Sequence, residues 1–260
     1  MINTFNDKLG KILANVCADL KSKQETKNTL IESISDVFWC KNYAPKENCC
    51  FNHWIGLPQK DGIEYPLYLY EEELFSDIER YDFLAIMKAT GLGITEFFLR
   101  YAEHQCLVKY ENAQVVILTG PSRELAKIQI GRIEKHLFGK INFEATSYEI
   151  RLPRGNLIKA FPSMNIDAAR SLTNPKLILI DEAAFFGMMA DEEVRAIAER
   201  YQAKSGAKVV IYSTPGLPEG MFYNLMKEAP SQYKRRYLSY TQGLVPHPTN
   251  LSLTMYDPKV

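Results

Sequence analysis

The sequence predicts an α/β protein whose central sheet is mainly parallel. From Tyr81 onward, short runs of apolar residues alternate with longer segments in which apolar residues recur every three or four positions. The first kind of segment is typical of strands buried on both faces, and the second is typical of the helices that cover them. Of the 260 residues, 46% are hydrophobic and 24% are charged, which excludes a chain that is disordered over most of its length.

Each predicted strand is a continuous apolar run, and a predicted helix follows each one. We predict strands at residues 83–87, 115–119, 177–180 and 208–212. The helices that follow them are expected at residues 94–107, 122–138, 191–203 and 221–228. Shorter strand-like pieces lie within residues 141–161, and a last one lies within residues 233–240. This alternation predicts a parallel sheet with helices on both faces.

The chain divides into three predicted parts. Residues 1–64 form a helical and irregular N-terminal extension, in which helical apolar spacing over residues 1–38 gives way to a segment interrupted by Pro and Gly. Residues 65–243 form the α/β domain, and residues 244–260 are expected to be a linker.

Charge balance and cysteine content narrow the possible functions. Lys and Arg together number 31, as do Asp and Glu, so the formal net charge is zero and a generally basic nucleic-acid coat is excluded. No apolar run approaches the roughly 20 residues of a membrane span, and no signal peptide is recognisable, so we expect a soluble intracellular protein without a membrane partner. Four residues of the extension leave a zinc site open as an alternative to free thiols: Cys40, Cys49, Cys50 and His53.

The loop after the first predicted strand has the composition of a phosphate-binding loop. It begins at Lys88, contains Gly91 and Gly93, and continues through Ile94 and Thr95 into a predicted helix. Glycines let backbone N–H groups approach phosphate oxygens, the helix N-terminus adds a positive dipole, and the threonine hydroxyl is placed to hold Mg²⁺. Compared with the pattern G-x-x-x-x-G-K-[ST], Ile94 takes the lysine position and Lys88 takes the place of the first glycine. The lysine is predicted to reach the phosphates from the entry of the loop, and a Gly-rich turn without a ligand is the alternative.

Two later strands also end in polar residues. Asp181 and Glu182 follow the third predicted strand, and Ser213 and Thr214 follow the fourth. Ligands of parallel sheets bind at the carboxyl ends of the strands, so these side chains are expected to meet the phosphate loop. Asp181 is predicted to hold Mg²⁺ together with the hydroxyl of that loop, and Glu182 to polarise the attacking water. The two hydroxyl residues are suited to sensing the γ-phosphate.

Taken together, these motifs resemble the ATPase domain of the large subunit of viral and phage terminases, which package double-stranded DNA. The resemblance covers roughly residues 65–243 and rests on three segments: Lys88 to Thr95, Leu177–Glu182 with the following Ala-Ala, and Tyr212-Ser-Thr-Pro. It implies a RecA-like phosphate-loop fold of the ASCE type, a three-layer sandwich that here follows the N-terminal helical extension. It also implies that ATP and Mg²⁺ are the cofactors. Lys88 and Glu182 would then be catalytic, and the residues named above in the loop and at the strand ends would bind the nucleotide and the metal.

The resemblance adds three further site residues. Tyr70 and Glu71 match the segment that reads adenine in that family, although Glu71 stands where glutamine is usual. Arg170 matches an arginine ahead of the acidic strand and is implied as a third catalytic residue, with Ser171 where glycine is usual. Whether Arg170 acts in its own subunit or as an arginine finger in a neighbour is left open.

The function implied by the resemblance is an ATP-hydrolysing motor that drives packaging of double-stranded viral DNA into a procapsid. It implies a homo-oligomeric ring on a portal in the cytoplasm of the host cell, with a small terminase subunit left open. Family members carry a nuclease domain after the ATPase, and no nuclease activity is expected within these 260 residues. One alternative is a superfamily 2 helicase-like ATPase lobe, because Asp-Glu-Ala-Ala differs by one residue from its Asp-Glu-Ala-Asp box. The other is a nucleotide-binding assembly module with little turnover, which Ile94 and Glu71 favour.

Two remaining features carry weaker signals. Lys234, Arg235 and Arg236 lie in a strand-like run with tyrosines, which predicts either a contact with the DNA backbone or an ordinary surface strand. His104 and His136 lie in predicted helices, and nothing in their sequence context predicts a partner for either.

Overall fold

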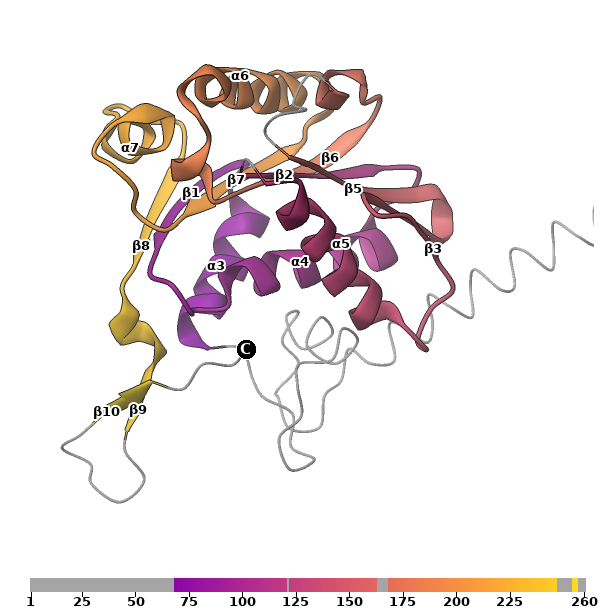
Figure 1. Ribbon diagram of the computed structural model, residues 1–260, viewed down its shortest axis with the longest axis horizontal. Coiled ribbons are helices and arrows are strands. Elements are labelled where there is room, and N and C mark those ends of the chain that lie inside the picture. The colour runs from indigo at the N-terminus through magenta and orange to yellow at the C-terminus, as the bar shows by residue number, and fades with distance from the viewer. Residues whose placement is uncertain (1–67, 121, 163–167, 247–253, 257–260) are drawn as a thin grey trace, which may run out of the picture. The chain divides into compact units, whose positions relative to one another are not determined.

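In the computed structural model of the protein, residues 68–120, 122–162, 168–246 and 254–256 are described (Figure 1). The predicted extension at residues 1–64, with its four candidate zinc ligands, lies outside the described residues. Two short strands fall within the predicted linker and pair antiparallel, β9 (Leu244–Pro246) and β10 (Thr254–Tyr256). Within the described part of the chain, no helix combines the length and the apolar character that crossing a bilayer requires.

The core of the domain is an eight-stranded sheet with the order β3-β4-β5-β2-β6-β7-β1-β8. The strands are β1 (Phe83–Lys88), β2 (Gln114–Thr119), β3 (Glu144–Ala145), β4 (Glu149–Leu152), β5 (Asn156–Pro162), β6 (Pro175–Asp181), β7 (Lys208–Ser213) and β8 (Lys234–Leu238). The six from β5 to β8 in this order pair in parallel, whereas β3 and β4 form an antiparallel edge. The prediction of a mainly parallel sheet is confirmed. The pieces within residues 141–161 turn out to be β3, β4 and β5, which extend the sheet.

Helices cover both faces of the sheet, as Figure 1 shows. The helices α3 (Leu69–Arg80), α4 (Ile94–His104) and α5 (Arg123–Leu137) lie on one face, and α6 (Met188–Ser205) and α7 (Gly220–Lys227) lie on the other. A hydrophobic core cluster joins strand residues such as Ala85 to Val194 of α6 and Phe222 of α7. Towards α4, the ring of Tyr212 stacks on that of Phe98 with 5.0 Å between their centroids. The three-layer α/β sandwich predicted from the sequence is confirmed.

The order of the strands decides where the polar strand ends meet. β7 lies between β1, which precedes the glycine loop, and β6, which ends in Asp181. Because β1, β7 and β6 are parallel and adjacent, their carboxyl ends lie at one edge of the sheet. One strand, β7, therefore separates the strand before the glycine loop from the strand that ends in the acidic pair.

Helix α3 was not predicted, and α4 and α6 extend further than predicted, the latter at both ends. Helix α3 buries Tyr70, Leu74, Phe75 and Ile78, which recur at helical spacing between acidic residues. Helix α4 continues into a π-helix at Gln105–Lys109, so the helical segment ends two residues later than expected.

His136 has two partners that its sequence context did not indicate. Its Nε2 lies 2.6 Å from Glu96 Oε1, and its Nδ1 lies 2.8 Å from Glu103 Oε1. His136 belongs to α5 and both carboxylates belong to α4, so the imidazole joins the two helices. Burial alone would lower the pKa of His136, but the hydrogen bonds and charges of Glu103 and Glu96 raise it to about 9. The sequence context could not indicate this contact, because the partners are about 30 to 40 positions away along the chain.

Candidate nucleotide site

The glycine loop joins β1 to the N-terminus of α4. Gly91 and Gly93 have φ values of 82° and 68°, in the left-handed region that glycine adopts without steric cost. Gly93 is the N-cap of α4, so the unpaired N–H groups of the first helical turn face the loop. Ile94, in the usual lysine position, is buried in the core. The loop therefore presents a helix N-terminus without a lysine at its helical end, and Lys88 is the cation at its entry.

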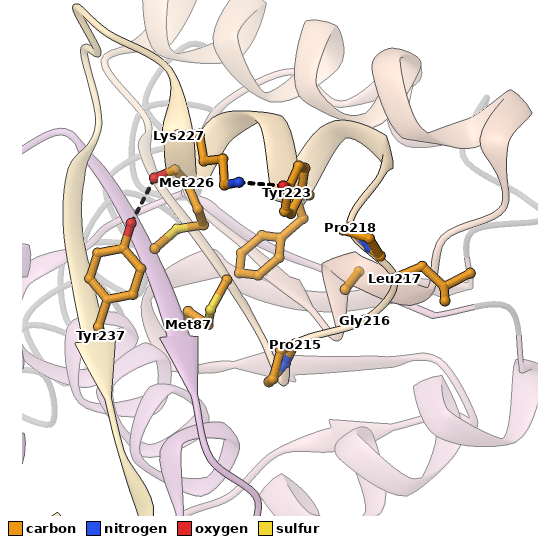
Figure 2. Close-up of a pocket in the computed structure, with 11 residues that line it drawn as sticks. Met87, Pro215, Gly216, Leu217, Pro218, Tyr223, Met226, Lys227 and Tyr237 are labelled. Carbon is orange, nitrogen blue, oxygen red and sulfur yellow. Dashed lines mark hydrogen bonds between the residues drawn. The ribbon is translucent and has the colours of Figure 1, made fainter.

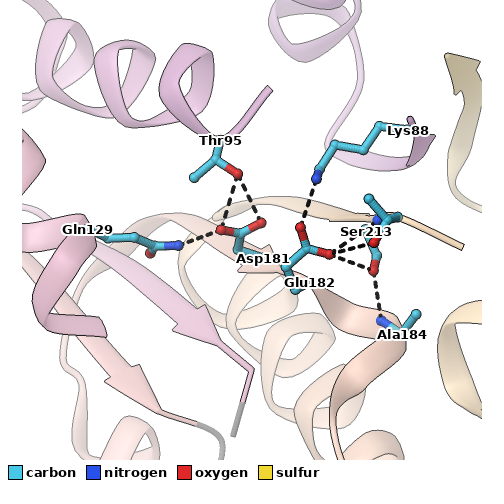
Figure 3. A network of polar contacts seen from close by, with 8 residues as sticks. Lys88, Thr95, Gln129, Asp181, Glu182, Ala184 and Ser213 are labelled. Carbon is cyan, nitrogen blue, oxygen red and sulfur yellow. Dashed lines mark hydrogen bonds and ion pairs between the residues drawn. The ribbon is translucent and has the colours of Figure 1, made fainter. Parts of the chain in front are cut away.

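Lys88 and Glu182 form an ion pair across the sheet edge (Figure 3). Lys88 Nζ donates to Glu182 Oε1 at 2.8 Å, and the two side chains are 8% and 30% exposed. The other oxygen of Glu182 accepts from the Ser213 hydroxyl at 3.2 Å and from the Thr214 hydroxyl at 3.1 Å. The backbone N–H of Thr214 donates to that oxygen as well, at 3.2 Å. Three strand ends thus converge on one carboxylate.

Asp181 lies beside this pair and contacts the start of α4. Thr95 Oγ1 donates to the Asp181 carboxylate, whose two oxygens both lie at 3.2 Å. Asp181 is only 5% exposed. Burial, and next the charge of Glu182, raise the pKa of Asp181 to about 7. Burial also acts to raise the pKa of Glu182, but the hydrogen bond and charge of Lys88 and the bonds from Thr214 lower it below its usual value. The two adjacent acids therefore differ in how strongly they hold a proton.

The backbone at Glu182 is strained. Its φ and ψ are 53° and 45°, a left-handed conformation that is uncommon for a residue with a side chain. The turn that follows is held by the backbone N–H of Ala184, which donates to Ser213 Oγ at 3.1 Å (Figure 3). Ser213 thus contacts both the carboxylate of Glu182 and the backbone two residues further on. Strain of this kind is concentrated at functional sites, where surrounding contacts over-determine the geometry.

The residues predicted to read adenine lie beside the loop. Tyr70 donates its hydroxyl to the carbonyl oxygen of Leu92 at 2.8 Å, and its ring stacks on Tyr68 with 5.4 Å between centroids. Glu71 Oε2 accepts from the backbone N–H of Tyr68 at 2.7 Å and so caps α3. Tyr70 therefore contacts the glycine loop directly, whereas this oxygen of Glu71 accepts a hydrogen bond from the first turn of its own helix.

The ion pair of Arg170 is not with a residue of the converging strand ends. It lies in the segment before β6 and forms an ion pair with Glu193 of α6, and its side chain is 46% exposed. This ion-pair partner belongs to a helix that contributes nothing to the group around Asp181 and Glu182 described above.

A residue that sequence reasoning missed completes the contacts of Asp181. Gln129 of α5 donates from Nε2 to Asp181 Oδ2 (Figure 3). It is 4% exposed and lies in phase with the apolar residues Ala126, Ile130, Ile133 and Leu137. A glutamine at a position that helical periodicity assigns to the core was the available signal.

An apolar groove lies next to the loop that follows Thr214 (Figure 2). Its volume is about 330 Å³, and Met87, Tyr237, Met226 and residues 215–218 contribute to its lining. The Tyr237 hydroxyl donates to the carbonyl oxygen of Met226 at 2.7 Å. The groove lies on the side of the sheet that α7 covers.

The basic residues of β8 form ion pairs, a hydrogen bond and a cation–π contact within the chain. Arg236 forms ion pairs with Asp77 and with Glu73, the second at 3.1 Å. Arg235 donates to the carbonyl oxygen of Met226 at 3.0 Å. Lys234 Nζ lies 5.6 Å from the ring centroid of Tyr81. These contacts favour the surface-strand interpretation over a DNA-binding edge.

Comparisons with known proteins show the fold. The chain resembles the large terminase ATPase domain of Thermus phage P74-26 with a TM-score of 0.51 and 15% identity, over 68% of this chain and 82% of that one. It resembles the large terminase of bacteriophage HK97 with a TM-score of 0.55 and 17% identity, over 69% of this chain and 40% of that one. For the large terminase of another thermophilic bacteriophage, in complex with ATP-gamma-S, the values are 0.53 and 14%, over 72% and 47%.

Sequence comparison adds nothing to this likeness. No family model matches the chain, and no curated protein matches it. The chain spans less than half the length of the HK97 terminase and of the terminase in complex with ATP-gamma-S. At identities below 20%, the likeness establishes a RecA-like fold shared with large terminase ATPase domains, which confirms the predicted fold class.

Proposed function

We propose that the chain is the ATP-hydrolysing motor domain of a large terminase subunit and drives packaging of double-stranded DNA into a procapsid. One observation carries the proposal: Lys88, Thr95, Asp181 and Glu182 form two adjoining hydrogen-bonded pairs at one edge of the sheet. A lysine, a hydroxyl and two carboxylates beside a glycine loop and a helix N-terminus are what hydrolysis of magnesium-bound ATP requires. The fold that the chain shares with large terminase ATPase domains supports the same function.

Thr95 and Asp181 would hold Mg²⁺. Both offer oxygen atoms, which Mg²⁺ prefers, and the hydroxyl oxygen lies 3.2 Å from the carboxylate oxygens. The hydroxyl can donate its hydrogen to Asp181 while a lone pair of its oxygen faces the metal. The residues present therefore fit the ion, which when bound would neutralise charge on the β- and γ-phosphates.

Lys88 and Glu182 would act on the phosphates and on water. The lysine ammonium has three hydrogens, so it can contact phosphate oxygens from the mouth of the loop while retaining a contact with Glu182. Because its pKa is lowered, Glu182 is ionised at neutral pH and can accept a hydrogen bond from a water molecule in line with the γ-phosphate. Ser213 and Thr214 hold the second oxygen of Glu182, so residues suited to sensing the γ-phosphate also orient the carboxylate.

The remaining partners follow from the resemblance. We propose ATP as the nucleotide, with Tyr70 and Glu71 near the adenine base, and double-stranded DNA as the polymer that is moved. Arg170 would act from the outside of the subunit, and its exposure at the surface is compatible with a contact in a homo-oligomeric ring. The proposal includes a ring of identical subunits on a portal, and it leaves a small terminase subunit open.

Phosphate release by the full chain tests the proposal. We would measure release with ATP and Mg²⁺, with and without double-stranded DNA, for the wild type and for Glu182→Gln. The motor predicts release by the wild type, stimulation by DNA and loss of release in the variant. Strand separation by the wild type would favour the helicase alternative. ATP binding without release under any condition would refute the motor and leave the nucleotide-binding module.

A further inference from the structure

Gln129 occupies a position on α5 that packing alone does not explain. The buried face of this helix consists of Ala126, Gln129, Ile130, Ile133 and Leu137, and Gln129 is the one polar residue among them. Burying an amide costs free energy unless its donors and acceptor are hydrogen-bonded. A methionine has nearly the same length and shape without that cost, so the amide requires an explanation outside the apolar core.

The amide group of Gln129 is directed at the carboxylate of Asp181. Its Nε2 donates to Oδ2, the same oxygen that accepts from Thr95 Oγ1. Its Oε1 is buried and has no hydrogen-bond partner among the described residues. One half of the amide therefore restrains Asp181, and the other half is an acceptor that is available to a water molecule or another donor at this site.

Gln129 is held in place from the other end of its helix. His136 lies seven residues later, two turns along the same helix, and bridges Glu96 and Glu103 of α4. Helix α4 begins at the glycine loop and carries Thr95 in its first turn. A largely buried ionic contact thus joins α5 to α4. Gln129 and Thr95 consequently approach Asp181 from two helices that are tied together.

We propose that Gln129 is a positioning residue for Asp181, which it holds in the orientation that receives Mg²⁺ together with Thr95. The inference rests on the proposed function, since it assigns Asp181 to the metal. Its physical basis is that carboxylates around a metal are oriented by hydrogen bonds from residues that do not touch the metal. Replacing such residues commonly lowers metal affinity about 10- to 100-fold.

Magnesium-dependent nucleotide binding, without turnover, tests the assignment. Binding of ATP-gamma-S to the full chain would be titrated calorimetrically at increasing Mg²⁺ and in EDTA. The proteins compared would be the wild type, Gln129→Met and Gln129→Leu. The matched control is Ile133→Val, which perturbs the same buried face of α5 without touching Asp181. Thermal unfolding of each protein without nucleotide would be measured in parallel.

We expect Gln129→Met to raise the Mg²⁺ concentration for half-maximal binding about tenfold, with unchanged affinity in EDTA and an unfolding temperature not below that of the wild type. Gln129→Leu should do the same, which keeps the test valid if one variant fails to fold. Equal Mg²⁺ dependence in the wild type and both variants would overturn the assignment while the proposed function stands. A shift shared with Ile133→Val would also overturn it, because the effect would then be structural. Absence of Mg²⁺-dependent binding in the wild type would refute the proposed function itself.

Discussion

The ammonium group of Lys88 lies 2.8 Å from a carboxylate oxygen of Glu182, although the two residues are 94 positions apart. Lys88 is the last residue of β1 and Glu182 follows β6, two strands that are separated in the sheet by β7. The pair therefore joins the glycine loop to the acidic strand end. In the proposed function, phosphate oxygens would share this ammonium group with Glu182, because it has three hydrogens to donate.

If the proposed function holds, replacing Glu182 by Gln should separate ATP binding from ATP hydrolysis. The amide can still accept a hydrogen bond from Lys88, but it cannot withdraw a proton from water. We expect kcat for ATP hydrolysis to fall about 10²- to 10⁴-fold, while the Kd for ATP does not rise. Steady-state phosphate release and equilibrium ATP binding on the same preparation would check both parts. A Kd raised in proportion to the loss of kcat would contradict the assigned role.

Replacing Lys88 by Met should damage both steps. The variant removes the positive charge at the mouth of the loop and leaves Glu182 without its ion-pair partner. We expect ATP affinity and kcat each to fall at least about tenfold, which corresponds to about 1.4 kcal/mol in each step. Lys127→Met is the matched control, because that lysine is exposed on α5 and pairs with Glu124. Similar losses in the two variants would mean that Lys88 acts only through the general charge of the protein.

Ser213 and Thr214 contact the same oxygen of Glu182, yet their removal should differ in its effect on stability. Ser213→Ala also deprives the backbone N–H of Ala184 of its acceptor, at a site where Ser213 is fully buried. We expect that variant to lower the free energy of unfolding by about 1–2 kcal/mol, and Thr214→Val by less than about 0.5 kcal/mol. Both should lower kcat several-fold, because each removes a hydrogen bond that orients Glu182. Urea denaturation and ATPase assays on the two variants separate these effects, and equal destabilisation would argue against the contact with Ala184.

The sequence was informative where local composition determines structure. Continuous apolar runs predicted β1, β2, β6 and β7. Because ligands of parallel sheets bind at the carboxyl ends of the strands, Asp181 and Glu182 were then expected beside the glycine loop. What escaped prediction depends on contacts between distant segments. Periodicity shows that Gln129 belongs to the buried face of α5, but not that this face reaches the end of β6. Likewise, the partners of His136 lie on α4, and only the packing of two helices brings them within 2.8 Å.

The bridge formed by His136 predicts a loss of stability at alkaline pH. Its folded-state pKa is raised to about 9, above the ordinary value of 6.5, so its contribution is complete below pH 6.5 and is lost as the pH rises through 9. Burial raises the pKa of Glu103 from its ordinary value of 4.5 to about 7, so the stability that its protonated form contributes is lost between about pH 4.5 and 7, mostly below the window of His136. The charged groups around this bridge include Glu96, Arg100 and Glu103 from α4, Arg132 from α5, and Lys140 just after α5.

We expect the free energy of unfolding to fall by about 2–3 kcal/mol between pH 6.5 and 9. In His136→Gln, most of this decrease with pH should disappear. Urea denaturation at a series of pH values would measure it. His104→Gln is the matched control, because burial lowers the pKa of His104 to about 4, outside this window. If His136→Gln kept the wild-type slope, the bridge would not be the titrating element.

Asn156 should be among the most sensitive positions for folding. It is buried at the start of β5, where its Oδ1 accepts from the Ala113 N–H at 2.9 Å. Its Nδ2 donates to the carbonyl oxygens of Cys106 and Tyr110 at 2.6 and 2.8 Å. The side chain therefore joins the π-helix and the residue after it to the start of β2 and of β5.

Asn156→Ala would leave one N–H and two carbonyl groups without their partner in the interior, so we expect a loss of about 3–5 kcal/mol in the free energy of unfolding. Asn174→Ala is the matched control: its Nδ2 donates to the Asn112 carbonyl at 3.1 Å in an exposed position, where we expect a change below about 0.5 kcal/mol. Urea denaturation of both variants measures the difference. Since Asn156 lies at the amino end of β5, away from the strand ends that form the site, ATP affinity of the folded fraction of Asn156→Ala should match the wild type. A small loss at Asn156, comparable with that at Asn174, would show that water replaces these three hydrogen bonds and that this corner of the sheet is not closed to solvent.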